Sequence, residues 1–404
     1  KLVGESPDAA HMARARDAIL AAGGAASANV FTRITLALFA QVPWRAVPVM
    51  PVEIMLLPNW FPFHLSKISY WSRTVLVPLL ILMALKPRAK NPRGINIEEL
   101  FIRKPEEEAR YLHNPTGSAW GELFLGIDKV LRKIEPILPR TARQRALKAA
   151  VKFIKPRLNG EDGLGGIFPA MANAVMAFEA LGYPKDDPDL LIAKSSIQKL
   201  LRLDGEKGFC QPCLSPIWDT GLVVHSLAEA NGSDETKELN RATTWLAEKQ
   251  ILDVAGDWAD NRPSLRPGGW PFEYANDYYP DVDDTAVVAL ALDRMDREKF
   301  RENIERAAEW IVGMQSKNGG WGSFDADNTY EYLNHIPFAD HGALLDPPTA
   351  DVTARCVGML AQLDTEKYTS EITRGVEYLK ADQEDKGSWF GRWGTNYVYG
   401  TWSV

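Results

Sequence analysis

The sequence is poor in the features that mark secreted, membrane-spanning and nucleic-acid-binding proteins. Only three cysteines occur in 404 residues, too few for a disulfide framework, which indicates a reducing, intracellular setting. The longest apolar run, residues 75–85, contains a proline and is far shorter than the about 20 residues of a membrane span, so it predicts a buried helix. The formal net charge of −7 argues against a general affinity for nucleic acid.

Further absences concern the chain ends and cysteine chemistry. Neither an initiating methionine nor a recognisable signal peptide is present, and residues 396–404 resemble the opening of another apolar helix. We therefore expect a fragment that lacks both ends of its natural protein. Cys210 and Cys213 have the spacing of a redox pair, but no strand–helix–strand pattern surrounds them, so redox chemistry is not expected.

The hydrophobic pattern is typical of an all-α protein. Apolar residues recur mainly at three- and four-residue spacing, and strict alternation is scarce. The first predicted helix has Ser6 as its N-cap, Pro7 at its first position and Gly23 as its stop. Further helices are predicted at 168–182, 187–202, 217–231, 234–250, 282–295, 300–315, 348–363 and 369–383. Short helices in such numbers usually stack as hairpins.

An internal repeat gives this pattern a specific architecture. Residues 241–258, 306–321 and 374–389 each carry Arg, a small residue, an aromatic and an aliphatic residue, then Gln, and close a Gly-containing turn on Trp. Residues 148–166 keep the frame without the Gln and the Trp. The Gln can bridge a helix end to the next helix start, and the Trp ring can shield those bonds from water. Helix hairpins joined in this way predict a closed α/α toroid, with the repeats as stability devices.

Three carboxylates precede an apolar run in a way that needs explanation. Asp281, Asp283 and Asp284 lead directly into a nearly continuous hydrophobic segment. A helix N-cap with acidic first-turn neighbours is one interpretation, although one Asp would suffice. A calcium loop would need Gly at its sixth position and Glu at its twelfth, where this chain has Ala286 and Leu292.

The other metal-based interpretations also fail. The segment 325–328 lacks the same two calcium-loop residues, and no second acidic cluster with basic residues indicates a magnesium–diphosphate site. The remaining interpretation is a proton donor, because crowded carboxylates beside an apolar wall cannot all ionise. In an extended lead-in, Asp281 and Asp283 would point the same way and Asp284 elsewhere. One of them could then hold a proton at neutral pH.

The repeats together with the Asp-Val-Asp-Asp-Thr run resemble the squalene-hopene cyclases, which are class II triterpene cyclases. The similarity covers nearly the whole chain and is densest over residues 214–402. It implies two α/α barrels (α6–α6), both incomplete here: residues 1–213 as a partial second barrel and 214–404 as a partial catalytic barrel. It also implies metal-independent, proton-initiated cyclisation of squalene to hopene and hopanol, with no cofactor. The 404-residue chain alone is expected to be inactive.

The resemblance assigns roles to individual residues. It makes Asp283 the general acid, tuned by Asp281 and Asp284, with Asp351 and Arg355 as supporting residues. The i, i+4 spacing places Asp351 and Arg355 on one helix face, where an ordinary intrahelical ion pair is the alternative. The best-known relatives carry His where this chain has Arg355, and Arg cannot relay a proton as His can.

The resemblance also implies an aromatic lining for a cavity in which carbocations form. Aromatic faces attract a cation without deprotonating it, with about 2 kcal/mol each when desolvated. The matching residues are Trp71, Trp218, Phe272, Phe324, Trp393 and Tyr399. Phe324 stands where well-known relatives have Tyr, so the π face is kept and the hydroxyl is lost.

One amphipathic segment is expected to contact a membrane. Residues 118–138 place an apolar stripe on one side, formed by Trp120, Leu123, Phe124, Ile127, Leu131 and Ile134. Lys129, Arg132 and Lys133 could meet lipid phosphates. In the family this region dips into the membrane beside the substrate entrance. The implied partners are therefore squalene and a membrane surface, with peripheral attachment on the cytoplasmic face, and a homodimer is allowed.

Two other functions remain open at this point. A class II diterpene cyclase would use the same acid run on a diterpenyl diphosphate and would need basic residues at a cavity mouth. A non-catalytic α-toroid binding protein would leave the acid run exposed, with ordinary pKa values. A prenyltransferase-like toroid is less favoured, because no convincing Asp/Cys/His zinc set is found.

Overall fold

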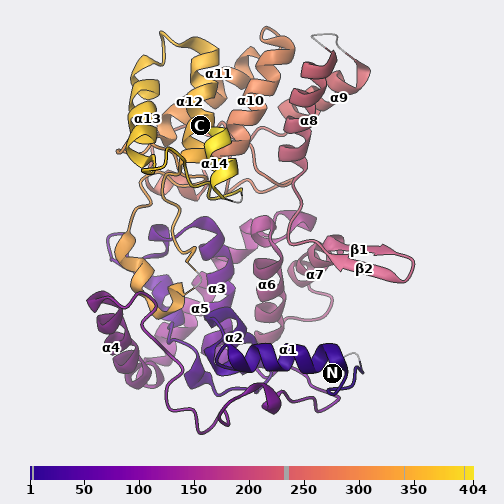
Figure 1. Ribbon diagram of the computed structural model, residues 1–404, viewed down its shortest axis with the longest axis vertical. Helices are drawn as coiled ribbons and strands as arrows, with labels where there is room; N and C mark the ends of the chain where they lie inside the picture. Colours follow the sequence, from indigo (N-terminus) through magenta and orange to yellow (C-terminus); the bar gives the residue numbers. More distant parts are fainter. Residues whose placement is uncertain (2–3, 232–235, 341, 395) are drawn as a thin grey trace. The chain divides into compact units, whose positions relative to one another are not determined.

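The computed structural model describes residues 1, 4–231, 236–340, 342–394 and 396–404. The helices of the first half are α1 (Ala10–Ala21), α2 (Val30–Leu38), α3 (Tyr70–Leu85), α4 (Ala119–Ile134), α5 (Arg140–Ile154), α6 (Phe168–Ala180) and α7 (Pro188–Leu200) (Figure 1). Those of the second half are α8 (Pro216–Asn231), α9 (Lys237–Glu248), α10 (Val282–Asp296), α11 (Arg301–Met314), α12 (Ala350–Asp364), α13 (Thr369–Asp382) and α14 (Tyr397–Ser403).

The all-α prediction is confirmed, with two local corrections. The predicted first helix begins later than expected: α1 starts at Ala10, and the Ser6 hydroxyl accepts the Asp8 N–H in the preceding turn instead of capping the helix. The only β-sheet in the described part of the chain is a hairpin that was not predicted, β1 (Leu201–Asp204) paired antiparallel with β2 (Lys207–Cys210). The eight helices predicted from residue 168 onward all occur, with ends shifted by a few residues.

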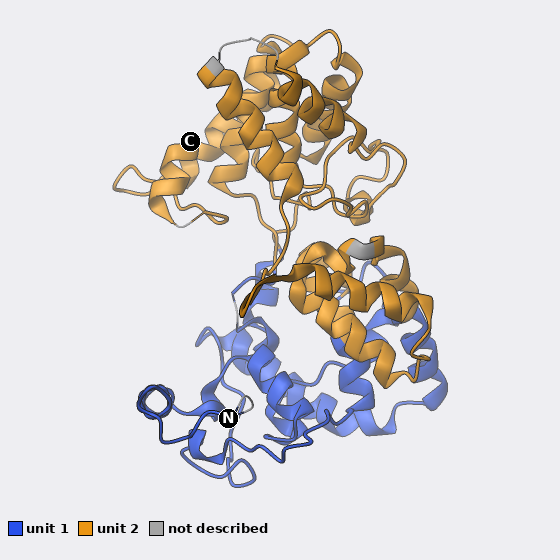
Figure 2. Cartoon of the chain, turned by 90° about the vertical axis from the view of Figure 1, so that its right-hand side faces the viewer, with its two compact units in different colours: residues 1–63, 79–150, 330–344 blue, residues 64–78, 151–329, 345–404 orange. Residues whose placement is uncertain are grey.

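The chain forms two compact units that are discontinuous in sequence (Figure 2). The first comprises residues 1–63, 79–150 and 330–344, and the second comprises residues 64–78, 151–329 and 345–404. The predicted division of the chain near residue 213 into two partial barrels stays a prediction.

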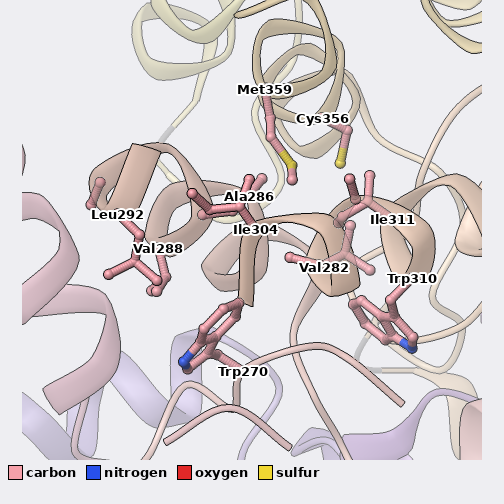
Figure 3. Close-up of a cluster of buried hydrophobic side chains, with 14 of the residues drawn as sticks. Trp270, Val282, Ala286, Val288, Leu292, Ile304, Trp310, Ile311, Cys356 and Met359 are labelled. Carbon is pink, nitrogen blue, oxygen red and sulfur yellow. The ribbon is translucent and has the colours of Figure 1, made fainter. Parts of the chain in front are cut away.

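In the second unit, helices from the C-terminal half pack in the alternating manner of an α/α toroid. Helix α10 packs against α8 and α12, and α12 packs in turn against α14. Of the intervening helices, α9 packs against α8 and α10, α11 packs against α10, and α13 packs against α12. Ten of the 15 residues of α10 are buried, and the core around it contains Val282, Val288, Leu292, Trp270 and Trp310 (Figure 3). The apolar run that follows the aspartates therefore forms the centre of the core.

Two of the three repeat Gln residues join consecutive hairpins as predicted, whereas the Gln383 amide donates to the Gly387 carbonyl within its own turn. The Gln250 side-chain amide donates to the Gly268 and Asn303 carbonyls, the latter in the first turn of α11. Gln315 makes the equivalent bonds to Gly319 and to Glu371 in the first turn of α13. Gln250 thus ties the end of α9 to the start of α11, and Gln315 ties the end of α11 to the start of α13.

The Trp of the first repeat was assigned to the wrong residue. Trp321 donates its indole N–H to Ile311, and Trp389 donates to Leu379, in both cases four residues before the repeat Gln. In the first repeat the residue that does this is Trp270, which donates to Leu246 at 2.6 Å. Trp258, which sequence spacing selected, is buried, but its indole nitrogen has no hydrogen-bond partner among the described residues. The first repeat therefore contains an insertion between its Gln and its Trp.

Helix α4 in the first unit corresponds to the expected membrane-contacting segment. Ser118 caps it by accepting the Gly121 N–H. Its outward face differs from the predicted stripe because Phe124 is buried with Leu125. The exposed apolar side chains on α4 have helical spacing and are Trp120, Leu123, Val130 and Ile134, and Ile137 follows in the 3₁₀ turn after the helix.

One of the three basic residues on α4 is already engaged. Arg132 pairs with Asp128 at 2.7 Å and donates to the Val47 carbonyl, so its expected contact with lipid phosphate is not supported. Lys129 and Lys133 are exposed. No helix in the described ranges has both the length and the apolar character needed to cross a membrane.

Candidate active site

The three aspartates lie at the buried start of α10. Asp281 is the N-cap, and its Oδ1 accepts the backbone N–H of Asp283 at 2.7 Å and of Asp284 at 3.3 Å. The predicted extended lead-in is wrong, because Asp283 and Asp284 belong to the first helical turn. The N-cap interpretation therefore describes Asp281, while two further carboxyls remain that capping does not require. All three side chains are buried.

Burial makes all three carboxyl groups weaker acids. It raises the pKa of Asp283 to about 6, with the Arg355 charge opposing the rise and Asp351 adding to it. For Asp281 and Asp284, burial and then the charges of the neighbouring aspartates hold the pKa well above its usual range. Burial thus favours the protonated form of all three carboxyl groups, and at Asp283 the Arg355 charge and hydrogen bond oppose this effect.

Arg355 pairs with Asp283 and not with Asp351. Its Nε lies 2.5 Å from Asp283 Oδ1, although i, i+4 spacing on α12 suggested an intrahelical pair with Asp351. Asp351 instead accepts the backbone N–H of Trp393 at 3.1 Å and that of Val352 at 3.1 Å. Asp351 therefore anchors the segment that carries Trp393, and Arg355 provides the positive charge at Asp283.

Arg355 also links the acid cluster to two of the predicted aromatic residues. Its guanidinium carbon lies 5.2 Å from the centre of the Trp218 ring, and its NH2 group donates to the Tyr399 hydroxyl at 3.0 Å. Phe272 is half-buried in the segment between Trp270 and the aspartates.

The other predicted aromatic residues form one cluster, although they are far apart in sequence. The ring centres of Trp71 and Trp393 are 5.3 Å apart, and Phe324 lies 5.9 Å from Trp71 and 6.2 Å from Trp393. Sequence reasoning missed two members: Tyr70 lies 4.1 Å from Phe324 and 4.4 Å from Tyr279. Their positions in the sequence could have identified both, because Tyr70 directly precedes Trp71 and Tyr279 lies two residues before Asp281.

Two buried acidic residues hold the loop that carries Phe324. The Asp346 carboxylate accepts the backbone N–H groups of Ser323, Phe324 and Asp325 at 2.7–3.2 Å. Asp325 in turn forms an ion pair with the buried Arg73 at 2.7 Å. Arg73 follows Trp71 by two residues in the sequence. These contacts fix the positions of Trp71 and Phe324, and neither was expected from the sequence.

This arrangement has the parts that acid-initiated carbocation chemistry requires. Desolvation keeps a proton on the aspartate cluster, and the Arg355 charge keeps the acid at Asp283 strong. Aromatic faces can stabilise positive charge where water is excluded; of the clustered rings, Phe324 is buried and Trp393 is 48% exposed. Within the described residues, no set of three or more His, Cys, Asp or Glu is arranged to hold a metal ion.

Comparisons with known proteins identify the family of the chain. The sequence signature of the squalene-hopene cyclase N-terminal domain matches residues 1–205, and that of the C-terminal domain matches residues 214–404. The chain belongs to the squalene-hopene cyclase family. The matches cover nearly the whole sequence, so both predicted halves have counterparts in this family.

Individual relatives show how far the similarity extends. The chain is 56% identical to the squalene-hopene cyclase of Zymomonas mobilis over 415 residues and 54% identical to that of Bradyrhizobium diazoefficiens over 410 residues. It is 38% identical to the squalene-hopene cyclase of Alicyclobacillus acidocaldarius over 408 residues. All of this chain is covered in each case, but only 63%, 62% and 64% of the respective relative. The chain therefore spans less than two thirds of the length of these relatives.

Proposed function

We propose that the full-length protein cyclises squalene to pentacyclic hopanoids, hopene and hopanol, by protonating a terminal double bond. The observation that carries this proposal is the buried aspartate cluster at the start of α10, linked through Arg355 to aromatic side chains. Family membership supports the choice of squalene over a diphosphate-bearing substrate. In this proposal residues 214–404 belong to the catalytic barrel and residues 1–213 to the second barrel.

Asp283 is the proton donor in this mechanism. Its O–H bond breaks as a C–H bond forms at the alkene, and the π electrons leave a tertiary cation on the adjacent carbon. Burial raises the pKa of Asp283 to about 6, so that part of the enzyme carries the proton near neutral pH, while the Arg355 charge stabilises the carboxylate that remains after the transfer. Asp281 orients Asp283 and Asp284 by capping the helix.

The aromatic side chains stabilise the cations that follow. Each ring closure moves positive charge to a new carbon, and a lone-pair base nearby would end the sequence early by removing a proton. Trp71, Phe324, Trp393, Trp218 and Tyr399 present ring faces, which contribute about 2 kcal/mol each when desolvated. Because Phe324 has no hydroxyl, its part is limited to this π interaction.

The test is incubation of the purified full-length enzyme with squalene and analysis of the hydrocarbons by gas chromatography and mass spectrometry. The proposal expects hopene and hopanol in amounts that grow with time. Absence of any cyclised product, with the protein folded and detergent present, would contradict it. A parallel incubation with a diterpenyl diphosphate distinguishes the alternative substrate class.

We further propose that helix α4 attaches the protein peripherally to a membrane, from which squalene is taken up. Trp120 and Leu123 are 53% and 51% exposed, and the apolar stripe continues through Val130, Ile134 and Ile137. An exposed apolar stripe on an amphipathic helix, begun by Trp and flanked by Lys129, is suited to the membrane interface. Squalene is so insoluble that uptake from a bilayer is physically reasonable.

A further inference from the structure

Asp257 lies outside the aspartate cluster, yet it joins segments that carry several of the aromatic residues. It begins the short 3₁₀ turn Asp257–Asp260. Its Oδ2 accepts a hydrogen bond from the Tyr279 hydroxyl at 2.5 Å and lies 3.7 Å from Arg73 Nη1. Its Oδ1 accepts a hydrogen bond from the Arg157 guanidinium. Both oxygens of this carboxylate therefore have partners, and the mechanism above gives it no role.

Arg73 is held in place by several groups besides Asp257. It is 2% exposed, and its guanidinium donates to three backbone carbonyls of residues 65–68 at 2.8–3.2 Å. It also forms the 2.7 Å ion pair with Asp325. Loss of the Asp257 carboxylate would therefore leave Arg73 in place, whereas the Tyr279 hydroxyl would lose its acceptor.

Tyr279 connects this carboxylate to the aromatic cluster. Its ring centre lies 4.4 Å from that of Tyr70, and the Tyr70 ring centre lies 4.1 Å from that of Phe324. The three rings are buried together, and Trp71 packs against them. The Tyr70 hydroxyl donates to the Gly165 carbonyl only at 3.4 Å, which is long for such a bond. The position of Tyr70 therefore depends mainly on the rings on either side of it.

The bond from Tyr279 to Asp257 is of a strong kind. Burial and then the Asp257 charge hold the pKa of Tyr279 well above its usual range, so the phenol stays protonated and acts as the donor. A hydroxyl that donates to a carboxylate makes a shorter and stronger hydrogen bond than two neutral groups make. The backbone adds to this contact, because the Asp257 N–H donates to the Tyr278 carbonyl at 3.1 Å. The Tyr279 ring is thus fixed from the side opposite Tyr70.

We propose that Asp257 is a positioning residue for the cyclisation: through Tyr279 and Tyr70 it fixes the Phe324 ring face, and it thereby sets how many rings close before the reaction ends. This inference rests on the proposed function. Cation–π attraction depends on the distance between the cation and the ring face, so a displaced ring stabilises the cation less. A less stabilised cation loses a proton to water before the next closure, as a neighbouring C–H bond breaks and its electrons form a C=C bond. The product then has fewer rings.

The test measures the product pattern of full-length variants incubated with squalene, by gas chromatography and mass spectrometry. Tyr279→Phe removes one hydroxyl and keeps the ring and every ion pair, and Asp257→Asn removes the charge at nearly constant size. In both variants the share of products with fewer rings than wild-type products should rise at least about fivefold. The falling limb of the pH profile should stay in place, because the contact between Asp283 and Arg355 is untouched.

A double variant and a matched control complete the experiment. Because both changes act through one hydrogen bond, Asp257→Asn combined with Tyr279→Phe should shift the product pattern no further than Asp257→Asn alone. Asp253→Asn, an exposed change in the same segment, should keep the wild-type pattern.

Two results would overturn the inference. One is a wild-type product pattern in Tyr279→Phe, whether or not its rate falls, since a lower rate alone would assign the hydroxyl a structural role. The other is a double variant whose shift is the sum of the two single shifts. Failure of the proposed function is distinguishable, because wild-type enzyme would then make no cyclised product at all.

Discussion

Arg355 places its Nε 2.5 Å from the Asp283 carboxylate, and this contact joins α12 to the first turn of α10. Two opposing effects act on the acidic proton of Asp283. Burial holds the proton on Asp283, while the fixed guanidinium charge makes the acid stronger.

Replacing Asp283 by Asn should abolish turnover while the protein stays folded. Asn fits the same space but has no acidic proton, and Asp281 would still cap the helix. We expect a loss of at least about 10³-fold in the rate of hopene formation, since the acid takes part in bond making. Thermal unfolding serves as the control, and residual activity within tenfold of wild type would exclude Asp283 as the donor.

Activity should decline as pH rises through the pKa of Asp283. Because that pKa is about 6 and the protonated form is active, kcat/KM should fall about tenfold per pH unit above it. Arg355→Gln removes the charge that lowers this pKa, so the falling limb should move upward by about 1–3 pH units. Arg355→Lys keeps the charge and should leave the limb near its original position. An unchanged profile in Arg355→Gln would show that another group controls the limb.

Stability should decrease from pH 5 to pH 8 because of Glu273. Its folded-state pKa of about 8 exceeds the unfolded value of 4.5, so the folded protein binds more protons in this interval and unfolding becomes easier as pH rises. Glu273→Gln removes this dependence. We expect the variant to match wild type at pH 5 and to exceed it at pH 8 by on the order of 2–4 kcal/mol in denaturant unfolding. Parallel pH curves for the two proteins would contradict the prediction.

The repeat Gln residues should contribute unequally to stability. Gln315 is buried, and its amide satisfies the Gly319 and Glu371 carbonyls, so Gln315→Leu should cost about 2–4 kcal/mol. Gln383 is exposed and its amide donates to Gly387, so Gln383→Leu should cost under about 1 kcal/mol. Denaturant midpoints of the two variants provide the comparison, and equal losses would argue against the bridging role.

Removing exposed apolar side chains from α4 should weaken membrane binding. The double change Trp120→Ser and Leu123→Ser takes away two half-exposed apolar groups, and we expect at least about a tenfold drop in liposome association of the full-length protein. The matched control is Leu203→Ser with Phe209→Ser in the β1–β2 hairpin, which removes comparable exposed area elsewhere. Unchanged liposome association of the α4 variant would refute the membrane role.

The sequence was most informative where local pattern alone decides structure. Three- and four-residue spacing located the helices, and the Gln positions identified the joints between hairpins. The choice of Trp71, Phe324 and Trp393 as a set anticipated their clustering, although more than 300 residues separate the first from the last. That choice came from the family resemblance, since no local pattern brings such distant rings together.

Other features could not be predicted, because they depend on how helices pack. The i, i+4 rule placed Arg355 near Asp351, but the packing of α12 against α10 gives it Asp283 as partner. Trp258 satisfied the expected spacing, and nothing in the sequence marked the insertion that makes Trp270 the true repeat residue. The hairpin had a signal that was overlooked: Asp204 is followed by Gly205, whose φ of 57° suits a tight two-residue turn.

The insertion between Gln250 and Trp270 has a wider consequence. These two residues make the same kinds of hydrogen bond as their counterparts in the shorter repeats. The inserted segment also supplies Asp257, which pairs with Arg73 at 3.7 Å and accepts a hydrogen bond from the Tyr279 hydroxyl at 2.5 Å. The hydrogen bonds that join the helix hairpins are thus independent of the length of the turn between the Gln and the Trp. A turn of the repeat can therefore be lengthened, and new side chains added in its loop, without loss of the bonds that join the helix hairpins.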